Sequence, residues 1–325
     1  MPGISVQQVQ AEVHSLWQAL TSREGDVLQG MYFPNAIVFG AVSHRSETAR
    51  LMLTRKRREF ANPKSSIHAE IGPIDVEISG NIAIASYPYH FRSTKHSADG
   101  NLLELDVPFA CGTQIFLEDG GVLRIIHEHL SVAEPGKKAP GSRPPASDST
   151  ASSEKKRSPG MSAKAPATDW MLAEFLPVEQ VRDGVRRFWQ FFSNKSQNEL
   201  LGMYFSNASV IPAGARRSEP ARLAMARRSR ELFGQGSSVR ADVGLIDVQA
   251  VRADASIASY TFHFQVVKLF PNGKRFSIDM PFARTTQLFR RDGDGALRIA
   301  HEHMSVPENG VYKELPTEVA AVAKK

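Results

Sequence analysis

Apolar residues in two parts of the chain recur at the spacing of an amphipathic helix. Between residues 6 and 20 they return every three or four positions, and residues 178–192 repeat the same spacing. This period places the apolar side chains on one helical face. A second, short helix is expected around Leu28 and Leu200 in the two regions. The pattern therefore predicts matching helical starts in two separate stretches.

A third helix and then strands are expected to follow. Ser46 and Ser218 are predicted N-caps, because serine oxygen accepts a hydrogen bond from the first helical turn. Beyond residue 66 the apolar positions alternate, with Asp-Gly and Asn-Gly turn signals between the runs. Alternation of this kind predicts strands joined by hairpins. Helices followed by a long antiparallel sheet indicate an α+β fold.

The two stretches belong to a repeat. GMYFPNA at 30–36 matches GMYFSNA at 202–208, and RIIHEHLS at 124–131 matches RIAHEHMS at 298–305. The offset is 172 residues at the start and grows to 174 at the end. A whole unit of about 130 residues, an ordinary domain size, is therefore duplicated.

The repeat defines the predicted domain organisation. One domain is expected over 1–135, a linker over 136–172, a second domain over 173–308 and a tail over 309–325. The linker is rich in Pro, Ser, Ala and Lys and has no apolar periodicity, which is typical of disordered segments.

Composition narrows the possible partners. The net charge is +6, but the stretch 134–169 contains seven basic and four acidic residues, so half of the excess lies in the linker and nucleic acid is not expected as a partner. No apolar run approaches the roughly 20 residues needed to span a bilayer. The N-terminus lacks the pattern of a signal peptide. The single cysteine, Cys111, excludes an intrachain disulfide, and a cytoplasmic location is expected.

The order of elements and the ending R-I-x-H-x-H-x-S resemble the SnoaL-like branch of the nuclear transport factor 2-like (NTF2-like, ketosteroid isomerase-like) superfamily. The ending is also similar to the association domain of calcium/calmodulin-dependent protein kinase II. The resemblance covers both repeats and implies two tandem cone-shaped domains. In each, three N-terminal helices would pack on a curved antiparallel sheet around a pocket. Because this fold hosts enzymes, binding modules and oligomerisation modules, the resemblance leaves the function open.

The repeated histidines are candidate pocket residues. Strict alternation would place His127 and His129 on the face of Leu123 and Ile125, which should be the helix-facing side. His301 and His303 repeat the pattern. Two imidazoles at this spacing could share a metal ion, but no third ligand is required by the spacing, and neither a metal nor a cofactor is expected. The alternative is that these histidines are hydrogen-bonded structural members of the sheet.

If the protein is an enzyme, the resemblance implies cofactor-free isomerisation, dehydration or cyclisation. His127 with His90, or His301 with His263, would then exchange the proton. Tyr32 or Tyr204 would donate to a developing oxyanion. Many relatives carry an acid just after the Tyr-Phe pair, where this chain has Asn35 and Asn207, which puts transfer of the isomerase mechanism in doubt.

The ligand is expected to be a small apolar or carboxylated metabolite. Arg284 in the second unit corresponds to Cys111 in the first and could attract a carboxylate if it points inward. Further predicted ligand contacts are His129, His303, Trp17 and Trp189. The alternative function is a non-catalytic assembly module. Self-association is expected in either case, as an intrachain pseudo-dimer or a homodimer.

Overall fold

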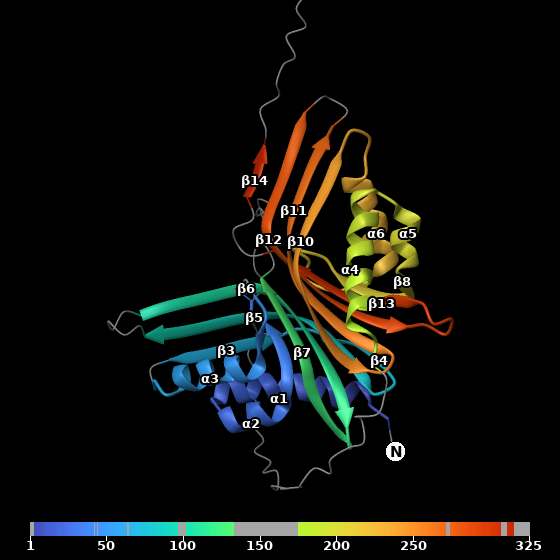
Figure 1. Ribbon diagram of the computed structural model, residues 1–325. Helices are drawn as coiled ribbons and strands as arrows, with labels where there is room; N and C mark the ends of the chain where they lie inside the picture. Colours follow the sequence, from blue (N-terminus) through green and yellow to red (C-terminus); the bar gives the residue numbers. More distant parts are fainter. Residues whose placement is uncertain are drawn as a thin grey trace, which may run out of the picture.

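The structure of the protein is a computed structural model (Figure 1), and it describes residues 3–41, 43, 45–63, 65–96, 102–132, 175–270, 274–306 and 311–314. The predicted linker over 136–172 lies outside the described residues. So does the predicted tail over 309–325, apart from Val311–Glu314.

The first half of the chain combines three helices with a seven-stranded sheet. The helices are α1 (Val6–Ser22), α2 (Gly25–Met31) and α3 (Ala49–Phe60). The strands are β1 (Tyr32–Phe39), β2 (Glu47–Thr48), β3 (Ser66–Ile71), β4 (Asp75–Ser79), β5 (Ile82–His96), β6 (Leu102–Asp119) and β7 (Val122–Val132).

The second half repeats this order. Its helices are α4 (Val178–Ser193), α5 (Gln197–Gly202) and α6 (Ala221–Leu232). Its strands are β8 (Tyr204–Ile211), β9 (Glu219–Pro220), β10 (Ser238–Arg252), β11 (Ala255–Leu269), β12 (Arg275–Arg291), β13 (Leu297–Ser305) and β14 (Val311–Glu314). The α+β class is confirmed in both halves.

The sheet differs from the predicted helices-then-strands order in one respect. In each half a strand, β1 or β8, lies between the second and third helices and pairs in parallel with the last long strand, β7 or β13. All the other described pairings are antiparallel. The prediction that strands begin only beyond residue 66 is therefore wrong. Tyr32 and Tyr204 are the first residues of these strands.

The first helix of each half forms as its apolar spacing predicts. Ser5 caps α1 by accepting a hydrogen bond from the Gln8 amide. The buried face of α1 presents Val9, Val13, Leu16 and Trp17 to the sheet. The predicted N-caps of the third helices are wrong by two residues, because α3 begins after Thr48, whose hydroxyl accepts from Leu51, and α6 begins after Pro220.

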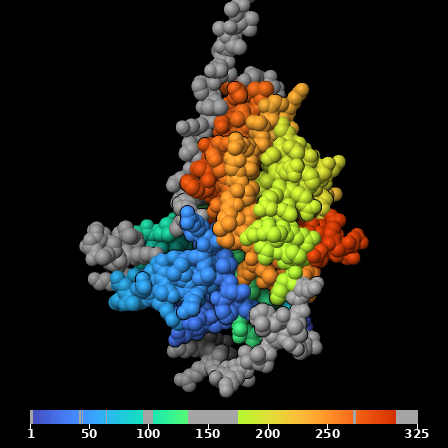
Figure 2. All heavy atoms as spheres, in the orientation of Figure 1, coloured from blue at the N-terminus to red at the C-terminus, as the bar shows by residue number. Residues whose placement is uncertain are grey.

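The helices cover one face of each sheet, and the other face packs against the other half. In Figure 1 the two sheets cross near β7 and β13, while the β5–β6 and β11–β12 hairpins project in different directions; in Figure 2 the two halves lie directly against each other. Between the sheets lies an aliphatic cluster of Ile82, Ile84, Ile115, Ile126, Ala255, Ile257 and Leu288. Burial of these aliphatic side chains between the halves favours the association of the halves through the hydrophobic effect.

A β-bulge decides which side chains reach which face. The pairing of β6 with β7 shifts between Ile125 and His127, so Ile126 is an extra residue. A one-residue bulge reverses the alternation for everything beyond it. Ile125 therefore packs with the helices, whereas His127 lies on the opposite face. The same shift occurs in β13 between Ile299 and His301.

Candidate functional site

The first half contains a cavity of about 400 Å³ between α1, α3 and the helix-facing side of the sheet. Its walls are mainly large apolar side chains. They are Trp17, Leu20, Val38, Met52, Ile67, Tyr89, Phe91, Leu105, Val107 and Leu130. A concave site of this size and apolar lining, with a few polar groups, is typical of small-molecule binding.

Glu128 is the buried polar group of this cavity. Its side chain projects from β7 on the helix-facing side, beyond the bulge, and the residue is 3% exposed. The Tyr32 hydroxyl donates a hydrogen bond of 2.9 Å to one carboxyl oxygen, and the Gln114 amide donates one of 2.8 Å to the other. The cavity therefore combines apolar walls with a carboxyl group held by two donors.

Burial controls the protonation of this pair. It raises the pKa of Glu128 above its usual value, although the hydrogen bonds from Gln114 and Tyr32 act in the opposite direction. Burial, and then the neighbouring Glu128, also raise the pKa of Tyr32 well above its usual value. A buried carboxyl with a raised pKa beside a neutral tyrosine is an arrangement suited to general acid–base chemistry.

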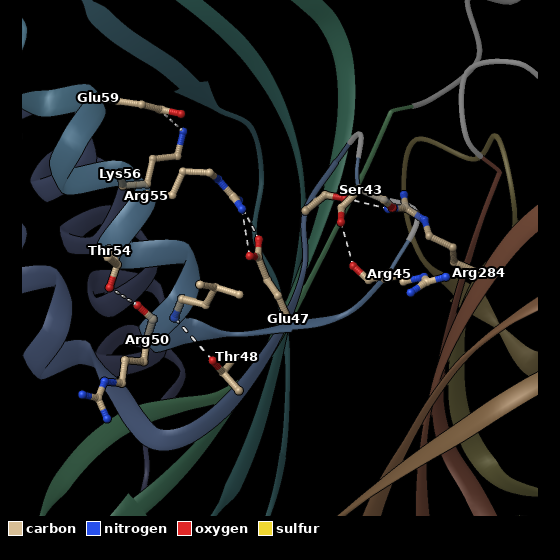
Figure 3. Close-up of polar contacts among 12 residues, drawn as sticks. Ser43, Arg45, Glu47, Thr48, Arg50, Thr54, Arg55, Lys56, Glu59 and Arg284 are labelled. Carbon is tan, nitrogen blue, oxygen red and sulfur yellow. Dashed lines mark hydrogen bonds and ion pairs between the residues drawn. The ribbon is translucent and has the colours of Figure 1, made fainter.

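Charged side chains of β2 and α3 line the cavity, and Figure 3 shows how they pair with one another. Arg55 makes two hydrogen bonds, of 2.8 and 2.6 Å, to the carboxylate of Glu47. Lys56 turns to Glu59, with its ammonium nitrogen 2.9 Å from a carboxylate oxygen. All four residues line the cavity, and each basic group has an acidic partner. The charges of these four residues therefore largely cancel.

The second half keeps the same polar groups but closes them with an arginine. Tyr204 donates to Glu302 at 2.8 Å and Gln287 donates at 2.9 Å. Arg228, which corresponds to Lys56, reaches inward and donates to Glu302 at 2.9 Å. Arg228 is 7% exposed and Glu302 is fully buried. Within the fold, the second half thus supplies its own cation to the buried glutamate.

The second half also has a bulkier aromatic core. Leu16 and Leu20 of α1 correspond to Phe188 and Phe192 of α4, both of which are buried. The Phe192 ring packs against Phe233 at 5.4 Å between centroids. Phenylalanine fills space that leucine leaves open. The two halves therefore share a fold but differ inside the helix-facing core.

The repeated histidines lie between the two halves. The prediction that His127, His129, His301 and His303 lie on the helix-facing side is wrong, because the bulges reverse the alternation. All four are fully buried and bond across the interface. These cross-interface pairs are His127 with Thr286 (2.9 Å), His129 with Thr286 (3.0 Å) and Ser305 (2.8 Å), His303 with Thr113 (2.9 Å) and Ser131 (2.9 Å), and His301 with Thr113 (3.4 Å).

Two of these imidazoles stack on each other, and burial disfavours the charged form of all four. The rings of His129 and His303 lie 3.9 Å apart with an interplanar angle of 11°. Burial lowers the pKa of His127 and of His301 to about 3. It also lowers the pKa of His129 and His303 well below the usual value. Their placement agrees with the structural interpretation of the H-x-H motif, and a catalytic or ligand-binding role for them stays a prediction.

His90 and His263 lie on the sheet face opposite to the helices and retain contact with solvent. His90 bonds to Asp106 at 2.6 Å, and His263 bonds to Asp279 at 2.5 Å. Both aspartates are exposed, with side chains 64% and 56% accessible. His90 and His127 do not meet around one cavity, and neither do His263 and His301. In each pair the first histidine keeps contact with solvent, whereas the second is fully buried between the two halves.

Arg284 is buried, but it points into the other half. Its guanidinium donates to the backbone oxygens of Gly40 (2.6 Å), Ser43 and Ala41 (3.2 Å), and its Nε donates to Ser305 (3.1 Å). Burial lowers its pKa to about 10, which leaves it charged at neutral pH. Gly40, Ala41 and Ser43 line the cavity of the first half. Arg284 therefore braces a wall of that cavity from behind, as the approach to Ser43 in Figure 3 illustrates.

The two predicted tryptophan contacts and the two predicted tyrosines lie at the helix–sheet core of their halves. Trp17 lines the first cavity and donates its indole hydrogen to Tyr87 at 3.0 Å, and Trp189 makes the equivalent bond to Tyr260 at 3.0 Å. Tyr32 also lines the cavity, whereas Tyr204 is enclosed with Glu302 and Arg228. Of the predicted residues, Trp17 and Tyr32 thus meet at one cavity.

Sequence reasoning missed Glu128 and Lys56. Glu128 lies between two histidines that are themselves candidate site residues. The sheet face on which its side chain lies depends on a β-bulge, and the alternation of apolar residues does not reveal this bulge. A charged residue repeated inside a buried strand was the available signal. Among the described residues, no group of three His, Cys, Asp or Glu side chains is placed to hold a metal ion. No described helix is long and apolar enough to cross a membrane.

No protein-family model matches the chain, and a search of the curated proteins found no match. Among solved structures it is similar to a protein with a cystatin-like fold from Caulobacter vibrioides (16% identity, 39% of this chain and 88% of that chain, TM-score 0.33). It is also similar to a protein of the NTF2-like family from Streptomyces avermitilis (14% identity, 39% and 95%, TM-score 0.33). A third is a ketosteroid isomerase-like protein from Erwinia carotovora (12% identity, 39% and 92%, TM-score 0.31).

Proposed function

We propose that the chain is a tandem pair of NTF2-like domains, over 1–135 and 173–308, whose first domain binds a small, largely apolar molecule. The observation that carries this proposal is the cavity of about 400 Å³ with Glu128 and Tyr32 at its buried end. The second domain is a closed copy, because the Arg228–Glu302 pair occupies the equivalent position. Its role is to support the first domain.

The polar pair suits proton transfer without a cofactor. Glu128 can give or take a proton at a bound molecule, because burial raises its pKa toward neutrality. Tyr32 can donate to an oxygen that gains charge. This supports chemistry of the isomerase, dehydratase or cyclase type in the first domain, with Glu128 in the proton-transfer role that the sequence had assigned to histidine. The assembly function is limited to the interface between the two domains.

Filling the cavity should weaken binding. Leu20→Phe installs in the first domain the residue that Phe192 provides in the second. Overpacking of this kind costs about 1–3 kcal/mol, so affinity should fall about tenfold or more. The probe is 1-adamantanemethanol, followed by calorimetry and by fluorescence of Trp17, which lines the cavity.

The matched control is Phe192→Leu, made in the second domain. It should leave the affinity for 1-adamantanemethanol unchanged. If the wild-type protein did not bind this neutral probe, or if Leu20→Phe bound it as well as the wild type does, the first cavity would not be the ligand site.

A further inference from the structure

The two domains contain the same buried carboxyl site in two states of occupation. Tyr32, Gln114 and Glu128 correspond one by one to Tyr204, Gln287 and Glu302, with hydrogen bonds of 2.8–2.9 Å in both. A carboxylate offers about four acceptor positions. In the second domain three of them are used, the third by the guanidinium of Arg228.

In the first domain the position of that cation is open. The residue corresponding to Arg228 is Lys56, and its ammonium group is bound to Glu59 instead. Within the described residues, the hydrogen bonds to Glu128 come from Tyr32 and Gln114, which are both neutral. A cavity of about 400 Å³ adjoins the carboxyl group. The first domain therefore presents the acceptor half of an ion pair whose donor half the second domain builds into its own chain.

The walls of the cavity also suit a cation on an apolar body. Trp17 lies 4.9 Å from Tyr89 and 6.3 Å from Phe91 between ring centroids, and all three line the cavity. Aromatic faces attract cations through their quadrupoles, and more strongly where water is excluded. The basic residues that line the cavity, Arg55 and Lys56, are each paired with an acid, so they do not exclude a positively charged ligand.

We propose that the first cavity binds an organic cation, an amine or guanidine on a compact apolar body, with the cationic group on Glu128 where Arg228 lies on Glu302. This deepens the proposed function and rests on it. An adjacent positive charge favours the ionised form of a carboxyl group, so a bound cation should lower the pKa of Glu128.

The test uses the full chain and three molecules with the same body. They are 1-adamantylmethylamine, 1-adamantanemethanol and 1-adamantanecarboxylate, which differ in charge. The amine should bind at least about tenfold more tightly than the alcohol, since charge-assisted hydrogen bonds are stronger than neutral ones. Calorimetry at pH 7 measures the three affinities.

Two variants locate the charge. Glu128→Gln should reduce amine affinity about tenfold or more and leave the alcohol within about threefold. Lys56→Arg should place a guanidinium on Glu128, as in the second domain, and abolish binding of the amine and the alcohol. Arg222→Lys, on the exposed surface of α6, is the control for a basic substitution and should change nothing.

The outcomes separate this inference from the proposed function. If the alcohol bound in the wild type but the amine were no tighter, or if the amine were unaffected by Glu128→Gln, the cation inference would be wrong while the ligand site stood. If the carboxylate bound most tightly, the ligand would be an anion. If none of the three bound, both proposals would fail.

Discussion

Lowering the pH from 7 to 5 should destabilise this protein by several kcal/mol, because four histidines are buried uncharged between its halves. Their pKa values lie far below the ordinary 6.5, at about 3 for His127 and His301. Below pH 6.5 the unfolded chain binds protons that the folded chain does not, so stability is complete above 6.5 and is lost as the pH falls toward 3. Each pH unit in that window costs about 1.4 kcal/mol per histidine, or about 8 kcal/mol for all four at pH 5.

Part of this loss is offset by acids. Burial raises the pKa of Glu12, Glu77 and Glu128, and a raised carboxyl pKa makes the folded state relatively more stable as the pH falls. The fixed charge of Arg284 lowers the pKa of His129 and His303 further, after burial and the neighbouring histidines. The slope of the unfolding free energy against pH should therefore remain strongly positive between pH 7 and 5.

Urea unfolding at half-unit pH steps measures this slope. The double variant His127→Gln/His301→Gln should reduce it by about half, whatever its effect on stability at pH 7. His14→Gln, on the exposed face of α1, is the matched control and should leave the slope unchanged. A wild-type stability that is flat between pH 7 and 5 would show that the histidine layer is hydrated or charged in the folded protein.

Removing the charge of Glu302 should be far more damaging than removing that of Glu128. Glu302→Gln leaves the guanidinium of Arg228 buried without its counterion, which typically costs about 3–5 kcal/mol. Glu128→Gln removes no ion pair, because its hydrogen-bond partners are the neutral Tyr32 and Gln114, and should cost less than about 1 kcal/mol. Chemical denaturation at pH 7 compares the two.

A second substitution identifies the cause. Glu302→Gln/Arg228→Met removes both charges and should recover most of the lost stability, because a well-packed apolar residue can replace a buried pair. Equal losses for Glu302→Gln and Glu128→Gln would mean that the two sites are equivalent, contrary to the asymmetry described above.

The sequence predicts the duplication, the helical starts and the hairpins, because each depends on local period and turn chemistry. It does not predict the face of the H-E-H segment. Alternation carried from Leu123 gives the wrong side for His127, since the extra residue Ile126 in β7 is visible only in the pairing with β6. Nor does it predict that Arg228 turns inward while Lys56 turns to Glu59, because both are basic residues on similar helices.

The histidine layer also bears on how many ligands one chain can hold. Each half buries its H-x-H strand against the other half in a reciprocal way, as the two subunits of a symmetric dimer do. Two identical subunits would necessarily carry two identical cavities. The two halves of a single chain can differ in sequence, so one half can fill the site with an internal salt bridge while the other half keeps an open cavity. The expected stoichiometry is one ligand per chain, and saturation at one equivalent would be the mark of a broken symmetry.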